Sequence, residues 1–144
     1  MKTFKTNKRK LLDKLGVDYG FGMKHDHRSR KWKRHYKKYG FDPRETWALS
    51  DATAWFMYER LYAYKRDASN VIDLAFHSFT VPLLDDKLDV HYEYINMKDA
   101  IDYALEYLEK GIKRHEADFM DDDWLIYVQD AMLIYTEILP ALWW

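Results

Sequence analysis

Hydrophobic residues recur with helical spacing along most of the chain. The clearest run follows Asn96, where apolar side chains return every three or four positions, at Met97, Ala100, Ile101, Ala104, Leu105, Leu108 and Ile112. This spacing places them on one face of an α-helix, and Asn is a favoured residue at a helix N-cap. We therefore predict a helix that begins after Asn96 and buries this face in the core.

Other segments also have helical patterns. Residues 27–39 carry an aromatic stripe and end at Gly40, a residue that commonly terminates helices. A second helix is predicted from a start at Asp42-Pro43, or from a further cap at Ser50, up to residue 66. Its apolar residues lie on nearly every side, which is typical of a central, covered helix. A last helix is predicted from the aspartates at 121–123 to Pro140.

The period changes in the middle of the chain. In residues 87–94 the apolar and aromatic positions alternate with polar ones, which is typical of a half-buried strand; the apolar set is Leu88, Val90, Tyr92 and Tyr94. Upstream, Phe79, Val81 and Leu83 alternate more weakly, and Pro82 between them suggests an edge strand. We predict a small antiparallel β-hairpin at about residues 76–94 that turns at Asp85-Asp86.

These patterns predict a mainly α fold, a compact helical domain of about four to five helices with one small hairpin. A chain of 144 residues is long enough to bury a substantial core. We expect residues 27–144 to form this single helical domain and residues 1–26 to form a basic N-terminal arm, either a short helix or mobile.

Composition narrows the chemistry. The chain has no cysteine, which removes disulfides, thiolate nucleophiles and cysteine-ligated zinc. It shows neither a run of about 18 apolar residues nor a secretory leader, so we expect a cytoplasmic protein without membrane attachment. Of the histidines, only His25 and His27 have a ligand-like spacing, and no HExxH, GxSxG, Walker or Rossmann pattern occurs. We predict no metal, no cofactor and no catalytic residue.

Charge is strongly segregated. Residues 1–44 contain 15 Lys/Arg against 4 Asp/Glu, whereas residues 45–144 contain 8 against 20. Either the basic segment packs on acidic parts of its own or a neighbouring subunit, or it forms a patch for an anion. The candidate patch lies on the 27–39 helix and consists of Arg30, Lys31, Arg34, Lys37 and Lys38.

One polar pair is of interest because of its spacing. Asp73 and His77 are four residues apart, so in a helix they would share a face, and in a strand both would also fall on one face, there opposite Ile72, Leu74 and Phe76. Either conformation lets a carboxylate and an imidazole converge. The pair is then either an orienting hydrogen bond inside a packed domain or part of a binding site.

Several blocks together resemble a family of small phage-encoded proteins. In that family YGF-x-x-x-E-T-W-x-L, I-D-L-x-F-H-x-F and a terminal tryptophan pair recur in this order, and here they correspond to residues 39–49, 72–79 and 143–144, within a resemblance over about residues 28–144. Family members carry Asp and Pro where this chain has Ser50 and Tyr58. Small phage proteins without catalytic signatures often act against host defence, so the resemblance implies a protein of the host cell's cytoplasm that either sequesters a nucleotide-derived immune signal or binds a host defence protein.

We therefore expect an anti-defence sponge, a protein that holds a small phosphorylated, nucleotide-like ligand without breaking bonds. Its ring would stack on tryptophans, its phosphates would bind arginine or the basic helix, and its hydroxyls would bind the polar pair; the candidate residues are Trp47, Arg60, Asp73, His77, Trp143 and Trp144. A homo-oligomer with the pocket at a subunit interface would suit this role. Alternatively, the terminal tryptophans only pack, or the protein inhibits a host protein directly or is a nucleic-acid-binding accessory protein; the acidic remainder disfavours the last.

Overall fold

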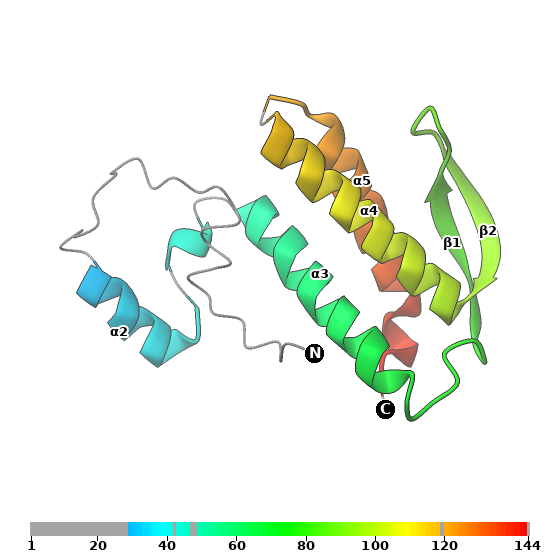
Figure 1. Cartoon of the computed structure of the whole chain (residues 1–144), viewed down its shortest axis with the longest axis horizontal. Helices are drawn as coiled ribbons and strands as arrows, with labels where there is room; N and C mark the ends of the chain where they lie inside the picture. Colours follow the sequence, from blue (N-terminus) through cyan, green and yellow to red (C-terminus); the bar gives the residue numbers. More distant parts are fainter. Residues whose placement is uncertain (1–28, 42, 47–48, 119, 144) are drawn as a thin grey trace. The chain divides into compact units, whose positions relative to one another are not determined.

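The computed structural model of the chain describes residues 29–41, 43–46, 49–118 and 120–143 (Figure 1). The chain divides into two units, Met1–Trp55 and Phe56–Trp144. The predicted arm at residues 1–26, with His25, and the candidates Trp47 and Trp144 lie outside the described residues.

The first unit contains α2 (Ser29–Tyr39) and a short 3₁₀ helix, η1 (Pro43–Thr46). Gly40 ends α2 as predicted, because its φ of 79° is a left-handed conformation that favours glycine. Trp32 is buried, whereas Tyr36 and Tyr39 of the same stripe are exposed. At the predicted start, Pro43 begins a separate 3₁₀ turn and Asp42 lies outside the described residues; the next α-helix begins only at Leu49, beside the second predicted cap.

Helix α3 (Leu49–Ala68) contains the division between the units. The prediction that it is covered on nearly every side is wrong, because Phe56 and Tyr62 are exposed; its buried side chains are Ala52, Ala54, Met57, Leu61 and Ala68. The aromatic residues were counted as core, but an aromatic ring also tolerates a surface position, where a Tyr hydroxyl can reach water.

Two packed helices form the core of the second unit, α4 (Met97–Ala117) and α5 (Asp123–Ile138). The predicted cap is confirmed, since the Asn96 side chain accepts a hydrogen bond of 2.9 Å from the backbone N–H of Asp99. The predicted α4 face is confirmed as well, because all its members are buried. At Gly111 the helices come so close that an added Cβ would lie 2.9 Å from the carbonyl oxygen of Trp124. A 3₁₀ turn, η2 (Leu139–Ala141), follows α5.

An antiparallel hairpin of β1 (Ser78–Leu84) and β2 (Val90–Asn96) completes the unit. Strand β1 packs on α4 and α5, and β2 lies on its outer side (Figure 1). The predicted hairpin is present, but the turn is longer than Asp85-Asp86 and includes Leu88 at a φ of 64°. Together with the helices, this confirms the predicted mainly α fold with a small hairpin.

The predicted facing of β2 is wrong. The register pairs Val81 with Glu93 and Leu83 with His91, and residues directly opposite share a face of the sheet. Since Val81 and Leu83 are buried, the face of β2 that points toward the helices carries His91 and Glu93. Val90, Tyr92 and Tyr94 therefore lie on the outer face, where they are exposed. Among the described helices, none is both long and apolar enough to cross a membrane.

Candidate functional site

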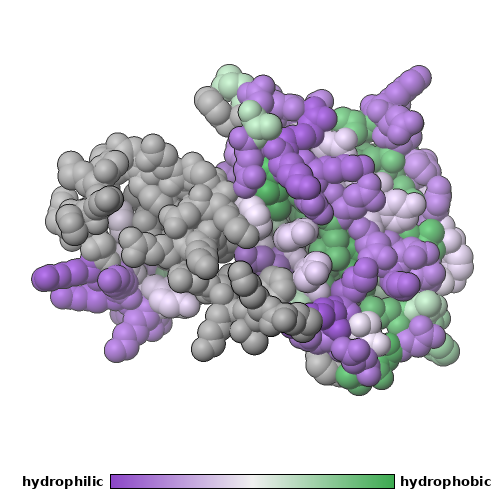
Figure 2. Space-filling view, in the orientation of Figure 1, coloured by the Kyte–Doolittle hydropathy of each residue, from purple (hydrophilic) through white to green (hydrophobic). Residues whose placement is uncertain are grey.

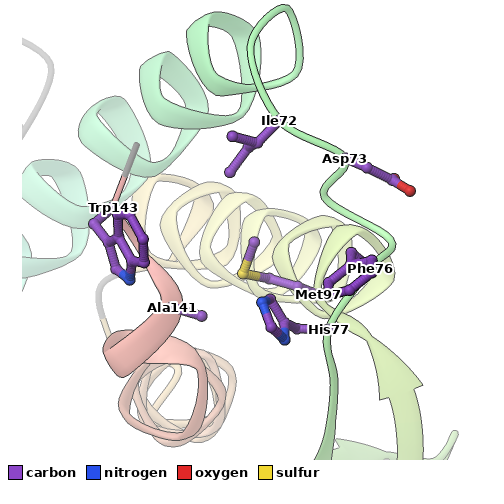
Figure 3. Close-up of a pocket in the computed structure, with 7 residues that line it drawn as sticks. All are labelled: Ile72, Asp73, Phe76, His77, Met97, Ala141 and Trp143. Carbon is purple, nitrogen blue, oxygen red and sulfur yellow. The ribbon is translucent and has the colours of Figure 1, made fainter.

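A cavity of about 350 Å³ lies in the second unit, where the loop after α3, the start of α4 and the C-terminal tail meet. It is lined by Ile72, Asp73, Phe76, His77, Met97, Ala141 and Trp143. Figure 3 shows His77 and Trp143 on different sides of the space, with the Met97 side chain beside His77. Three of the residues singled out in the sequence, Asp73, His77 and Trp143, therefore line one cavity.

The loop that forms one wall is a series of turns. The carbonyl of Ala68 at the end of α3 accepts the N–H groups of both Val71 and Ile72 at 2.9 Å. Asp73 then accepts the backbone N–H of Ala75 through Oδ1 at 2.9 Å, a local bond that is typical of aspartate in turns. The segment is neither helix nor strand, so the expected separation into two faces is wrong, and Phe76 joins His77 at the same cavity.

The loop is fixed to the beginning of α4. The carbonyl of His77 accepts the N–H of Met97 at 2.8 Å, and the carbonyl of Leu74 accepts the N–H of Lys98 at 3.1 Å. The first N–H groups of a helix have no partner within the helix, so these loop carbonyls satisfy two of them. Leu74 is also buried. The position of His77 is thus set by backbone bonds to a rigid helix.

The tail forms the opposite wall. Tyr64 of α3 donates a long hydrogen bond, 3.5 Å, from its hydroxyl to the carbonyl of Ala141, and burial raises the pKa of Tyr64. Lys65, the next residue of α3, forms an ion pair with Asp102 of α4. The indole of Trp143 is 75% exposed, so it is not sealed in the core. The tail therefore presents a large aromatic ring at the edge of the cavity.

The lining suits a flat, largely apolar group. Phe76 is 76% exposed, and its ring meets the His77 imidazole edge-on, with 4.9 Å between ring centroids. Met97, almost fully buried, supplies an apolar floor. Figure 3 shows the Asp73 carboxylate turned away from Met97, and its Oδ1 is already used within the loop. His77 is thus the polar side chain best placed to bond a ligand in the cavity.

The predicted phosphate-binding residues are not among the residues that line the described part of the cavity. The Arg60 guanidinium lies over the Phe56 ring, 3.5 Å from its centroid, and Arg60 is not among the residues that line the cavity. Lys and Arg are also missing from the described lining. The basic side chains of α2 belong to the first unit and are exposed; they are Arg30, Lys31, Arg34, Lys37 and Lys38. The described part of the cavity therefore offers a place for a ring rather than for a phosphate.

Four residues of the cavity had not been predicted as site residues. Ile72 and Phe76 belong to the same segment as the polar pair, and Ala141 precedes the terminal tryptophans, so their closeness in sequence was an available signal. Met97 carried no such signal, because its spacing assigns it to the core face of α4. Only the fold brings it beneath the loop.

A buried carboxylate lies apart from this cavity. Asp130 of α5 is only 3% exposed, and within the described residues neither of its carboxylate oxygens accepts a hydrogen bond. Burial raises its pKa to about 6, and the positive field of His91 on β2 partly offsets that rise. No group of three or more His, Asp or Glu side chains within the described residues could hold a metal ion.

Apolar side chains also reach the surface near the cavity. Figure 2 shows hydrophobic atoms exposed low on the second unit, in the region of the loop that follows α3, which includes the exposed Val71 and Phe76.

Comparisons with protein-family models, with curated proteins and with solved structures each return no match.

Proposed function

We propose that the protein is a binding protein that sequesters a small ligand with a flat heteroaromatic ring, of the kind a nucleotide-derived signal carries, and leaves it chemically intact. The observation that carries this proposal is the cavity between Trp143, Phe76 and His77, with Met97 beneath. Exposed aromatic rings at the edge of an apolar cavity are costly in water, and a bound ring would cover them.

The size and lining of the cavity support a ring ligand. About 350 Å³ lies at the lower end of the range for small-molecule sites, so it fits one ring system rather than an extended chain. Stacking of a base on an aromatic side chain contributes roughly 1–3 kcal/mol. Two such contacts and one hydrogen bond from the His77 imidazole would together contribute roughly 3–7 kcal/mol, which corresponds to a dissociation constant between about 10 mM and about 10 μM.

The ligand's phosphates would project away from the described lining. Asp73 at the rim disfavours a phosphate there by like-charge repulsion. The expected roles of Arg60 and of the α2 cations in holding phosphate stay predictions. On this basis a nucleoside should retain much of the affinity of the corresponding nucleotide for the cavity.

Calorimetry tests the proposal directly. Purine and pyrimidine nucleosides and nucleotides are titrated into the protein, and any bound ligand is released by denaturation and identified by mass spectrometry. We expect saturable heat with at least one ring-bearing ligand and its recovery unchanged. Absence of binding across the panel, or recovery of a hydrolysed product, contradicts the proposal.

The His77→Ala variant locates the binding site. Loss of one hydrogen bond should weaken binding by roughly threefold to tenfold. The melting temperature should stay unchanged, since the His77 side chain is exposed. His91→Ala on the hairpin is the control and should bind like the wild type. A large fall in the melting temperature of the His77 variant would instead indicate a structural role.

A second candidate function is binding of a polyanion by α2. It is favoured by the exposure of the basic side chains of this helix, in which the described residues include no acidic one. Nucleic-acid binding of this kind would weaken steeply with salt, because each neutralised phosphate releases counterions. Filter binding at low and moderate salt measures this, and a flat response excludes it.

A further inference from the structure

The outer edge of β2 is an unprotected strand edge. Among the described residues the sheet has only two strands, β1 and β2, so β2 has a strand neighbour on one side alone. Tyr92 and Tyr94 are 69% and 76% exposed, and the strand contains neither Pro nor Lys, which commonly block edge pairing. A two-stranded hairpin is also of marginal stability by itself, so added strands would stabilise it.

The backbone of β2 has bonding groups directed to that open edge. In an antiparallel pair, alternate residues bond the neighbouring strand. Pro82, opposite Tyr92, has no N–H to donate, so these two residues are not a hydrogen-bonded pair. Met97, an odd number of positions after Tyr92, donates its N–H to the carbonyl of His77 on the β1 side. The backbone N–H and C=O groups of the odd-numbered residues of β2 therefore point toward β1. The N–H and C=O groups of Val90, Tyr92 and Tyr94 point outward and are available to another strand.

We propose that two copies of this chain pair through their β2 strands, antiparallel and with Tyr92 opposite Tyr92 of the partner subunit, to form a continuous four-stranded sheet. Charge complementarity within one short strand favours a second copy as the occupant, because His91 and Glu93 have opposite signs and form an ion pair of 3.0 Å within the strand. In this register His91 lies opposite Glu93 of the partner subunit, and the two-fold axis repeats the pair. On the outer face, Val90 lies opposite Tyr94 of the partner subunit.

Neighbouring registers are less favourable. Only registers that are shifted by an even number of residues keep the outward-pointing backbone N–H and C=O groups of both β2 strands opposite each other. A two-fold axis at Glu93 would place Glu opposite Glu, and an axis at His91 would place His opposite His. Like charges directly opposite are destabilising in a sheet. Tyr92 is therefore the position on the axis that the charges select.

The pairing leaves room for the helices of both subunits. Helices α4 and α5 cover the inner face of β1, but the His91 and Glu93 side chains on the inner face of β2 remain 46% and 50% exposed. The two β1 strands would lie three strand spacings apart, roughly 14 Å. That separation exceeds the diameter of one helix, about 10–12 Å, so the helix nearest each β1 strand has room on its own side of the two-fold axis.

Cysteine cross-linking tests the register. The chain has no cysteine, so Tyr92→Cys introduces a single thiol. Cα atoms of a bonded antiparallel pair lie about 5.5 Å apart, within disulfide range. We expect rapid formation of a covalent dimer under mild oxidation with oxidised glutathione at low protein concentration.

Tyr94→Cys is the matched control, another exposed tyrosine on the same face of the same strand. In the proposed register its copies are four residues apart, too far for a disulfide, so it should remain largely monomeric on a non-reducing gel. Equal cross-linking of both variants, no cross-linking of Tyr92→Cys, or cross-linking of Tyr94→Cys alone overturns the proposal.

A charge exchange tests the same interface in solution. Glu93→His places His opposite His and should weaken the dimer roughly tenfold, because two symmetric pairs are lost. The double exchange His91→Glu with Glu93→His restores opposite charges and should recover most of the affinity. Sedimentation equilibrium measures both against the 17.5 kDa chain. A wild type that stays monomeric at high micromolar concentration, or an exchange that fails to restore a weakened dimer, contradicts the pairing.

Discussion

The interface between α4 and α5 and the outer strand β2 belong to the same unit but use aromatic and apolar residues in opposite ways. Between the helices, Leu108 and Ile134 are fully buried, and Gly111 allows the backbones to approach closely. On β2, the Tyr92 and Tyr94 rings lie in water. The helix interface therefore buries its apolar side chains, whereas β2 and the wall formed by Trp143 expose aromatic rings, which we propose contact other molecules.

Truncation of a side chain in each region gives the largest expected contrast. Leu108→Ala should lower the free energy of unfolding by about 2–5 kcal/mol, because it leaves a cavity between the helices. Tyr94→Ala on β2 should change it by less than about 0.5 kcal/mol in the monomer. Chemical denaturation measures both values. Similar losses in the two variants would show that the hairpin face is part of the core.

The buried Asp130 of α5 makes the free energy of unfolding dependent on pH. Its pKa is about 6 in the folded protein, above the unfolded value of 3.8, so the folded state binds its proton more tightly. Its contribution to stability is therefore most favourable below pH 4 and is lost as pH rises from about 4 to about 6. Above that range the ionised carboxylate should cost about 3 kcal/mol.

Asp130→Asn keeps the size of the side chain and removes this titration. Relative to the wild type, we expect equal stability near pH 4 and about 2–3 kcal/mol more stability at pH 8. Urea titrations at both pH values measure the difference. The control is Asp86→Asn in the exposed hairpin turn, which should change stability little at either pH. A pH-independent difference for the Asp130 variant would contradict the assigned pKa.

Gly111→Ala tests the close approach of the helices. In an ordinary helix this change stabilises by about 1 kcal/mol. Here the new Cβ would lie 2.9 Å from the Trp124 carbonyl and 3.0 Å from Val128 Cγ2, so we expect a net loss of about 1–3 kcal/mol. Thermal and urea unfolding measure the loss. An unchanged or raised stability would indicate that α4 and α5 can separate at no cost.

The start of α4 gives the smallest expected effect. Asn96→Ala removes the bond to the Asp99 N–H and should cost about 1 kcal/mol. Asn96→Ser, which retains a capping oxygen, should recover most of that loss. Equal stability of the two variants in urea titrations would show that the cap does not contribute.

The elements with local signals were predictable from the sequence. The Asn96 cap and the buried face of α4 depend on spacing and on one side chain, and both are confirmed. Alternation in β2 also predicted a strand, but it cannot say which of its two faces meets the core. The orientation of β1 determines this, because its Val81 and Leu83 are buried on the inner face of the hairpin. Glu93 and His91, which lie opposite them, are therefore on the inner face too.

The candidate site was predictable only in part. Asp73, His77 and Trp143 were singled out by residue type, and they line one cavity. Its geometry depends on turns after α3 and on carbonyl bonds to the first N–H groups of α4, which no periodic pattern reports. The burial of Asp130 likewise depends on how α5 packs against the hairpin, so the helical pattern of the sequence could not predict that this polar residue is buried.

The central claim is that the exposed ring of Trp143 binds the flat part of a ligand. The most direct measurement compares ligand affinity by calorimetry for the wild type, Trp143→Phe and Trp143→Ala, with the melting temperature of each. We predict that Ala weakens binding by roughly 5- to 150-fold, the equivalent of about 1–3 kcal/mol, and that Phe restores most of it. All three should melt at the same temperature, since the indole is 75% exposed. Unchanged affinity in Trp143→Ala would contradict the claim.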